Sequence, residues 1–282
     1  MAFDPTSGDL VDADFIPADP ANLSAPIQAI LNHDATGILV SDQINDVVQE
    51  YDLDGNYVGI FAPAGGANTS IMDNLRGICL RPNGNLLVST GSGTNAGACP
   101  EFDTDGNYLG VFLPATGPSA FDVIRLVDNT FMTGDIEADA LYTYDATGSL
   151  TGTFTSINTF PEQIFQTGSG NILVGNFSGT EEGVVEYNSS GTLINIYNPP
   201  TLGEYRGAYE LPNGNILTTN GSGVHEIDRS GNLVETKISG VSARFITLVE
   251  PVGEVPLSPL VIPVIILVIL TFGVIRFRLL LK

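Results

Sequence analysis

The 282-residue chain has few basic residues, few cysteines and few histidines, and each scarcity argues against a class of function. Lysine and arginine total 10 against 32 acidic residues, and three of the ten bases lie at the C-terminal end. Because every acidic residue lies within residues 1–254, this part of the chain repels nucleic-acid phosphates and anionic lipid headgroups. We interpret the charge as a solvated acidic surface, with ligand steering and calcium binding as the alternatives.

The two cysteines are too few for a disulfide framework. Cys79 falls in the first strand of its predicted repeat and Cys99 at the start of the third, with a second strand between them. Because neighbouring strands lie about 4.8 Å apart, the two residues would be separated by roughly 10 Å, beyond the reach of a disulfide. We therefore predict two free thiols.

The two histidines, His33 and His225, are predicted in a turn and in a strand. Neither has the arrangement of a catalytic triad or of metal ligands around it. The sequences DLDG at 52–55 and DTDG at 103–106 match the start of a calcium loop, but the twelfth position, which must hold an acid, is proline in both. We predict hairpin turns there, with no metal and no cofactor.

What the sequence does contain is a repeat of short apolar runs separated by glycine turns. Residues 206–239 show it best, as four runs of strand length joined by three turns that carry glycine. Glycines of the last turn in each unit are spaced by 47, 51, 42, 43 and 40 residues, as in the blades of a propeller. These glycines are Gly8, Gly55, Gly106, Gly148, Gly191 and Gly231.

The sequence RGICLRPNGNLLV at 76–88, followed by FDTDG at 102–106, resembles the NHL-type repeat. The resemblance covers nearly all of residues 1–249 and implies a β-propeller of four-stranded blades. A β-sandwich and a β-helix are the alternative folds, but a regular four-strand unit of about 40–45 residues argues against both. We therefore predict an all-β fold, a six-bladed β-propeller over residues 1–250.

The ring is predicted to be closed by both ends of the chain. Residues 1–17 supply the third and fourth strands of the last blade, and the sequence ARFITLV at 243–249 supplies its first strand. Only five second strands can be found for the six blades, so this shared blade is short of one strand. Closure of this kind pins the termini together and removes exposed sheet edges.

The C-terminal region predicts a membrane anchor that follows a linker at 251–256. Residues 257–275 carry no charge and are about as long as the apolar segments that span a bilayer. The bases that follow, Arg276, Arg278 and Lys282, place this end in the cytoplasm and the propeller outside. Residues 257–282 are therefore predicted to form a single transmembrane helix with a basic cytoplasmic tail.

A proline segment, an apolar helix and an arginine pair follow one another at the C-terminus. This order resembles the C-terminal sorting signals processed by exosortase-type transpeptidases, and it implies cleavage near residues 255–259 with release or attachment to the cell surface. Permanent anchoring in the cell membrane is the alternative. An outward-facing domain needs an export signal, which residues 1–10 do not show. We expect the natural protein to extend upstream by a signal peptide and at least one strand.

Charged residues recur at one place in the predicted blades. Aligning the first strands puts Ile27 and five charged side chains at the start of the innermost strand, around the mouth of the central channel, where long loops also converge. The five are Arg76, Asp122, Glu162, Arg206 and Arg244. Mutual ion pairing that closes the channel is one interpretation. The other is a pocket for a carboxylate, a sulfate or a sugar acid, because guanidinium groups match such anions bidentately.

Gluconolactonase-like six-bladed enzymes, which the predicted fold resembles, bind metal at this place through acids and asparagine. An arginine ring disfavours a cation, so we predict a binding or protein-interaction scaffold at the cell surface rather than an enzyme. The expected partner is an extracellular protein, a glycan or a small anion, with no role for nucleic acid. The alternative function is that of an extracellular hydrolase or lyase that uses the channel mouth.

Overall fold

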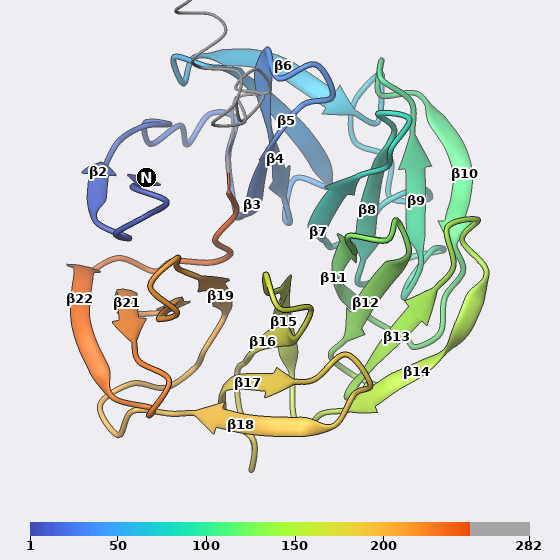
Figure 1. Ribbon diagram of the computed structural model, residues 1–282. Helices are drawn as coiled ribbons and strands as arrows, with labels where there is room; N and C mark the ends of the chain where they lie inside the picture. Colours follow the sequence, from blue (N-terminus) through green and yellow to red (C-terminus); the bar gives the residue numbers. More distant parts are fainter. Residues whose placement is uncertain (249–282) are drawn as a thin grey trace, which may run out of the picture. The chain divides into compact units, whose positions relative to one another are not determined.

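The computed structural model describes residues 1–248, which form antiparallel β-sheets arranged around a ring (Figure 1). Five of the sheets are four-stranded blades in which each strand pairs with the next along the chain. Blades 1 and 2 consist of β3 (Pro26–Leu31), β4 (Gly37–Asp42), β5 (Val47–Asp52) and β6 (Tyr57–Ala62), then β7 (Leu75–Leu80), β8 (Leu86–Thr90), β9 (Cys99–Phe102) and β10 (Tyr108–Leu113).

The other three blades repeat this pattern. Blade 3 consists of β11 (Ala120–Arg125), β12 (Phe131–Asp135), β13 (Ala140–Tyr144) and β14 (Leu150–Ser156). Blade 4 consists of β15 (Pro161–Gln166), β16 (Ile172–Asn176), β17 (Gly183–Tyr187) and β18 (Leu193–Tyr197). Blade 5 consists of β19 (Gly207–Glu210), β20 (Ile216–Asn220), β21 (Gly223–Ile227) and β22 (Leu233–Ser239).

The hydrophobic core lies between neighbouring blades rather than within one sheet. The second strands β4, β8, β12, β16 and β20 are buried along their whole length, because a blade covers each of their faces. Between blades 1 and 2, Leu39 and Val48 pack against Leu75 and Phe102. The outermost strands alternate between exposed and half-buried side chains, as expected of sheet edges with one face in water.

Antiparallel pairing sorts the connections onto two faces of the ring. Turns between first and second strands, and between third and fourth strands, lie on one face, which we call the turn face. Loops between second and third strands and connections between blades lie on the other, the loop face. Every first strand therefore begins at the loop face, and its opening residues surround the mouth of the channel there.

The prediction of six blades is corrected to five. Between blades 5 and 1 the described residues form only a two-stranded sheet of β1 (Ala2–Phe3) and β2 (Leu10–Asp12). Residues 243–248, predicted as a first strand, form none. They make only scattered bonds to neighbouring strands, and among them Ala243 N donates to Asn220 O of β20 at 3.0 Å. Ile246 N and O bond the amide of Gln163 at 2.9 and 2.6 Å, and Phe245 N donates to Ile27 O.

Both ends of the described chain nevertheless pack into this sector and join its neighbours. Phe3 and Ala243 contact the core of blade 5 around Leu217. Phe15 contacts the core of blade 1 around Tyr51. The apolar contacts of the sector are therefore present, while most of its strand pairing is not.

Other expectations can be compared directly. Cys79 lies in β7 and Cys99 in β9, on either side of β8, and both are free thiols, as predicted. Among residues 1–248 no helix is long and apolar enough to cross a membrane. The linker and the span predicted at 251–256 and 257–275 lie outside the described residues.

Candidate functional site

Strand register defines the residues that surround the channel mouth. In each blade one first-strand residue pairs with the middle of the second strand, and these residues are Ala29, Ile78, Val123, Ile164 and Ala208. The residues two places earlier are Ile27, Arg76, Phe121, Glu162 and Arg206. With Arg244, which joins them through an ion pair to Glu162, we call them the ring residues. The register shifts just here in blades 1 to 4, as bulges commonly do beside functional sites.

Asp122 does not belong to the ring, contrary to the prediction, because Phe121 takes its place. Asp122 lies one residue later and is completely buried. Its carboxylate accepts hydrogen bonds from Ile164 N in blade 4, at 2.7 Å, and from Val123 N, at 2.8 Å. Burial raises the pKa of this carboxyl to about 7, although the two backbone donors oppose the rise. Asp122 therefore ties blade 3 to blade 4 and is closed off from solvent.

Arg76 is a ring residue that the fold already uses. It is 5% exposed, and its Nη1 donates to Ser119 Oγ at 3.0 Å and to Ala120 O at 3.2 Å, both at the entry to blade 3. Its guanidinium lies 4.5 Å from the centre of the Phe121 ring. Burial lowers the pKa of Arg76 to about 10, against the raising influence of Glu162. Through these contacts Arg76 bridges blades 2 and 3.

Glu162 is the most unusual group at the mouth. It is 1% exposed, and its Oε2 has no hydrogen-bond partner among residues 1–248. The ion pair to Arg244 Nη1 spans 3.9 Å, too long for a hydrogen bond. Burial raises the pKa of the carboxyl to about 7, while Arg244, Arg206 and Arg76 oppose the rise. A buried carboxyl that titrates near neutrality and keeps one oxygen free can still accept or donate a proton.

Arg206 and Arg244 are the more accessible bases of the ring. Arg206 Nη1 donates to Ser242 Oγ at 2.9 Å, while its buried Nε has no partner among the described residues. The side chain of Arg244 is 36% exposed and makes only the long ion pair to Glu162 within residues 1–248. Burial and the charge of Arg206 together lower the pKa of Arg244. Three guanidinium groups thus surround one carboxyl, and the ring keeps an excess of positive charge.

An aromatic cluster beside the arginines was not predicted. Phe121 packs against Phe160 at 5.8 Å and against Phe245 at 5.9 Å between ring centres. Phe160 packs in turn against Phe177 at 5.5 Å. Arg206 lies 5.5 Å from the centre of the Phe177 ring. The cluster gives the charged ring an apolar neighbour, and no charge or turn signal in the sequence points to it.

Phe160 holds an unusual backbone conformation in the connection between blades 3 and 4. Its φ angle is +71°, a region that bulky residues rarely occupy. The backbone on both sides is fixed, because Phe160 N donates to Asp139 Oδ1 at 3.2 Å and Phe177 N donates to Phe160 O at 3.1 Å. Such outliers persist only where surrounding contacts determine them, and they often occur at functional sites.

Metal binding finds no support in the donor set of the described part. No group of three or more histidine, cysteine, aspartate or glutamate side chains that could hold a metal ion occurs within residues 1–248. The DLDG turn at 52–55 instead closes on itself, since Asp52 Oδ1 accepts hydrogen bonds from the backbone of Asp54 and Asn56. At the ring, the surrounding guanidinium groups would repel a cation.

Comparisons with known proteins place the fold. A scan against protein-family models and a search of curated proteins both found no match. Solved structures are similar: a gluconolactonase from Xanthomonas campestris superposes with a TM-score of 0.65 and 16% identity, covering 81% of this chain and 80% of that chain. A virginiamycin B lyase from Staphylococcus aureus has a TM-score of 0.57 and 12% identity, covering 76% and 70%. A chain of a nidogen–laminin complex has a TM-score of 0.53 and 15% identity, covering 64% and 65%. At these identities the similarity shows a β-propeller fold.

Proposed function

We propose that the propeller is a binding module whose channel mouth captures an anionic ligand, with a carboxylate as the group recognised. The observation that carries this proposal is the charge of the ring, in which three guanidinium groups surround one partly protonated carboxyl. Arg206 and Arg244 are the bases with capacity for a ligand, because Arg76 is committed to Ser119 and Ala120. A carboxylate could accept paired hydrogen bonds from either guanidinium.

The aromatic cluster narrows the expected ligand. Phe160, Phe177 and Phe245 are only partly buried, so an apolar or ring-shaped body attached to the carboxylate could pack beside them. Sugar acids and aryl carboxylates both combine these features. The loop face, where variable loops surround the mouth, offers further contacts to a larger glycan or protein.

Equilibrium titration with glucuronate and with phenylacetate tests this proposal. We expect saturable binding that is lost when Arg206→Ala and Arg244→Ala are combined, and that persists in the exposed control Arg125→Ala. Circular dichroism of each variant separates loss of binding from loss of fold. Unchanged binding in the double variant would move the site away from the ring.

A hydrolase or lyase activity is the second candidate, and Glu162 is the observation that favours it. Its free oxygen and a pKa near 7 suit a general acid or base. The structural relatives include proteins named as a gluconolactonase and as a lyase. Turnover of lactones or uronates by the wild-type protein, absent in Glu162→Gln, would favour the enzyme. Elemental analysis of the purified protein would show whether a metal accompanies it.

We propose further that the propeller is displayed outside the cell on a single membrane span formed by residues 257–275. The support is the uncharged sequence of that segment and the bases that follow it. Cleavage near residues 255–259 remains part of this proposal as the alternative to permanent anchoring. An acidic propeller held away from an anionic membrane surface is consistent with this arrangement.

A further inference from the structure

On the turn face, four blades carry a glutamate at the same place in the third strand. Each pairs with a leucine of the second strand, and the four are Glu50, Glu101, Glu186 and Glu226. Each also accepts a hydrogen bond from an asparagine amide of the neighbouring turn, and these asparagines are Asn32, Asn85, Asn171 and Asn215. A carboxylate–amide pair is therefore built four times around the ring, with the asparagine at the start of the turn in blade 1 and at its end in the other three.

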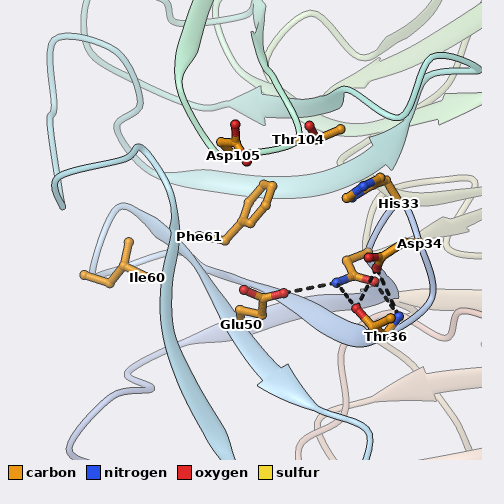
Figure 2. A pocket seen from close by; sticks show the side chains of 9 residues that line it. His33, Asp34, Thr36, Glu50, Ile60, Phe61, Thr104 and Asp105 are labelled. Atoms are coloured by element: carbon orange, nitrogen blue, oxygen red, sulfur yellow. Dashed lines mark hydrogen bonds between the residues drawn. The ribbon is translucent and has the colours of Figure 1, made fainter.

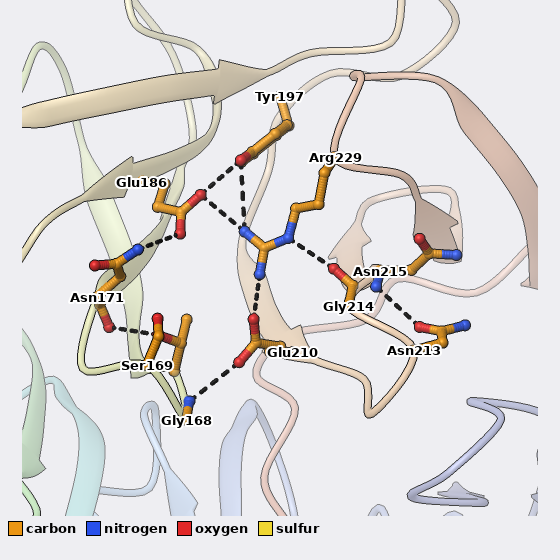
Figure 3. A network of polar contacts seen from close by, with 11 residues as sticks. Gly168, Ser169, Asn171, Glu186, Tyr197, Glu210, Asn213, Gly214, Asn215 and Arg229 are labelled. Carbon is orange, nitrogen blue, oxygen red and sulfur yellow. Dashed lines mark hydrogen bonds and ion pairs between the residues drawn. The ribbon is translucent and has the colours of Figure 1, made fainter.

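Three of the four glutamates also hold a basic side chain. Arg81 pairs with Glu101, and Lys237 pairs with Glu226 at 2.9 Å. Arg229 pairs with Glu186 at 2.8 Å and reaches Glu210 as well, as Figure 3 shows. Glu50 has no ion pair among residues 1–248. Blade 1 thus has the carboxylate and the amide without the cation.

The missing cation has a specific cause in the sequence. Arg81 begins the turn between the first two strands of blade 2, where its N–H donates to Asn85 O. Asn32 fills the equivalent position in blade 1, where its N–H donates to Gly37 O. Arg229 follows Asp228 in the third-to-fourth turn of blade 5. In the corresponding turn of blade 2, which lies beside Glu50, the residue after the aspartate is Thr104. Neither replacement carries a charge.

A cavity of about 350 Å³ lies where the cation is missing (Figure 2). Its walls include Glu50, Asn32, Thr104 and Phe61, together with the acids Asp34 and Asp105. The imidazole of His33 also lines it, and no lysine or arginine does. Phe61 corresponds to Phe112 of blade 2, whose ring lies 3.7 Å below the Arg81 guanidinium. In Figure 2 the labelled side chains lie around Phe61, so the cavity has an aromatic wall as well as the carboxylate.

We propose that this cavity is a binding site for an organic cation, an alkylguanidinium or alkylammonium group, that takes the place of the basic side chain the other blades supply. Glu50 accepts the hydrogen bonds of the cation, as Glu186 does from Arg229, and Phe61 packs against its face, as Phe112 does against Arg81. Asp34 and Asp105 add negative potential at the opening. The site lies on the turn face and is therefore separate from the channel mouth.

The test uses the full chain, which contains no tryptophan, so that one introduced indole reports alone. With n-butylguanidinium chloride as the probe at low ionic strength, we expect a saturable fluorescence change in Phe61→Trp. The matched variant Phe112→Trp should give none, because Arg81 already covers that ring. A rise in the melting temperature of the wild-type protein with the same probe gives a reading that needs no reporter.

Two further variants test whether probe binding needs the carboxylate of Glu50 and the absence of a basic side chain at position 104. Glu50→Gln should lower the affinity for the probe roughly tenfold or more, because the cation then bonds to a neutral amide instead of a carboxylate. The equivalent Glu101→Gln should leave the affinity for the probe unchanged. Thr104→Arg places a guanidinium at the Arg229 position and should abolish probe binding. Absence of a saturable signal, or equal binding by wild-type protein and Glu50→Gln, would overturn the proposal.

The natural cation could be a free amine or a side chain of a partner protein. Titration with acetyl-Gly-Arg-Gly-amide beside n-butylguanidinium distinguishes these sources. Equal or tighter binding of the peptide would indicate an arginine of a protein partner, and weaker binding would indicate a small free cation. Both results require that the same Glu50→Gln variant loses binding.

Discussion

Glu162 Oε2 and Arg244 Nη1 lie 3.9 Å apart at the channel mouth, near enough to attract each other and too far apart for a hydrogen bond. The carboxylate is buried and the side chain of Arg244 is one-third exposed, so the pair is only partly shielded from water. Because the attraction does not offset the burial, the carboxyl keeps a pKa near neutrality. Glu162 Oε2 therefore keeps no hydrogen-bond partner among residues 1–248.

We expect Glu162 to make stability depend on pH. Its pKa rises from 4.5 to about 7 on folding, so the folded state binds the proton more tightly, and its contribution to stability is present below pH 4.5 and lost as the pH rises through 7. Relative to Glu162→Gln, the wild-type free energy of unfolding should therefore fall by on the order of 2–3 kcal/mol across this range. Urea denaturation measures it. The exposed control Glu137→Gln should follow the wild type, and parallel curves for wild type and Glu162→Gln would contradict the assignment.

Arg76 is expected to matter for stability more than for binding. Arg76→Ala removes the bonds to Ser119 Oγ and Ala120 O and leaves their acceptors buried. The free energy of unfolding should fall by roughly 2–4 kcal/mol. Arg125→Ala, at an exposed position, should change it by less than about 0.5 kcal/mol. Chemical denaturation measures the free energy of unfolding of both variants. Equal small decreases would show that Arg76 does not stabilise the contact between blades 2 and 3.

Strands and turns were predictable because their signals are local. Glycine turns and apolar runs specify each blade wherever they lie in the chain. Register was harder, and the error at Asp122 shows why. The sequence alignment puts Asp122 at the position of Arg76, whereas the register of β11 is fixed at its other end by the turn in which Leu126 N donates to Thr130 O. Counting back from that turn would have identified Phe121 as the ring residue.

The site was predictable only where charge repeats along the sequence. Arg76, Glu162 and Arg206 share a place in the strand register, and Arg244 lies beside Glu162 although it belongs to no strand. Whether an arginine is free or committed depends on contacts with the next blade, such as those of Arg76 with Ser119, which a single repeat does not reveal. The turn-face cavity could have been found, because comparing Thr104 with Arg229 in the aligned turns exposes the missing charge.

The proposed anchor leads to a simple prediction. Because residues 257–275 are uncharged and long enough to span a bilayer, we expect the full chain to remain in the membrane fraction after a high-salt and carbonate wash. A shortened chain that ends at Glu254 should move to the soluble fraction. Retention of the shortened chain would assign membrane attachment to the propeller, and a wild-type product that ends near residues 255–259 would favour processing over permanent anchoring.

The repeated turn glycines carry a constraint between blades that the sequence pattern alone does not reveal. A Cβ on Gly106 would lie 1.7 Å from the carbonyl oxygen of Phe61 in the preceding blade, and Gly55, Gly148 and Gly191 meet the carbonyls of Phe15, Phe112 and Phe154 in the same way. Gly170, in a first-to-second turn, has a similar φ of +87° and no neighbour within 4 Å of an added Cβ. The two positions therefore separate the cost of the backbone conformation from that of close approach.

We expect Gly170→Ala to lower the free energy of unfolding by about 1–2 kcal/mol, the cost of a left-handed conformation with a side chain. Gly106 has a φ of +76°, and Gly106→Ala should cost at least twice as much, because the added methyl group must also push blade 2 away from blade 1. This movement would stretch the hydrogen bond of 2.8 Å that Ala64 N donates to Gly106 O. Denaturation of the two variants under one set of conditions gives the comparison. Equal losses would mean that the blades can separate without cost at this turn, so that the turn conformation alone explains why a glycine recurs there in each blade.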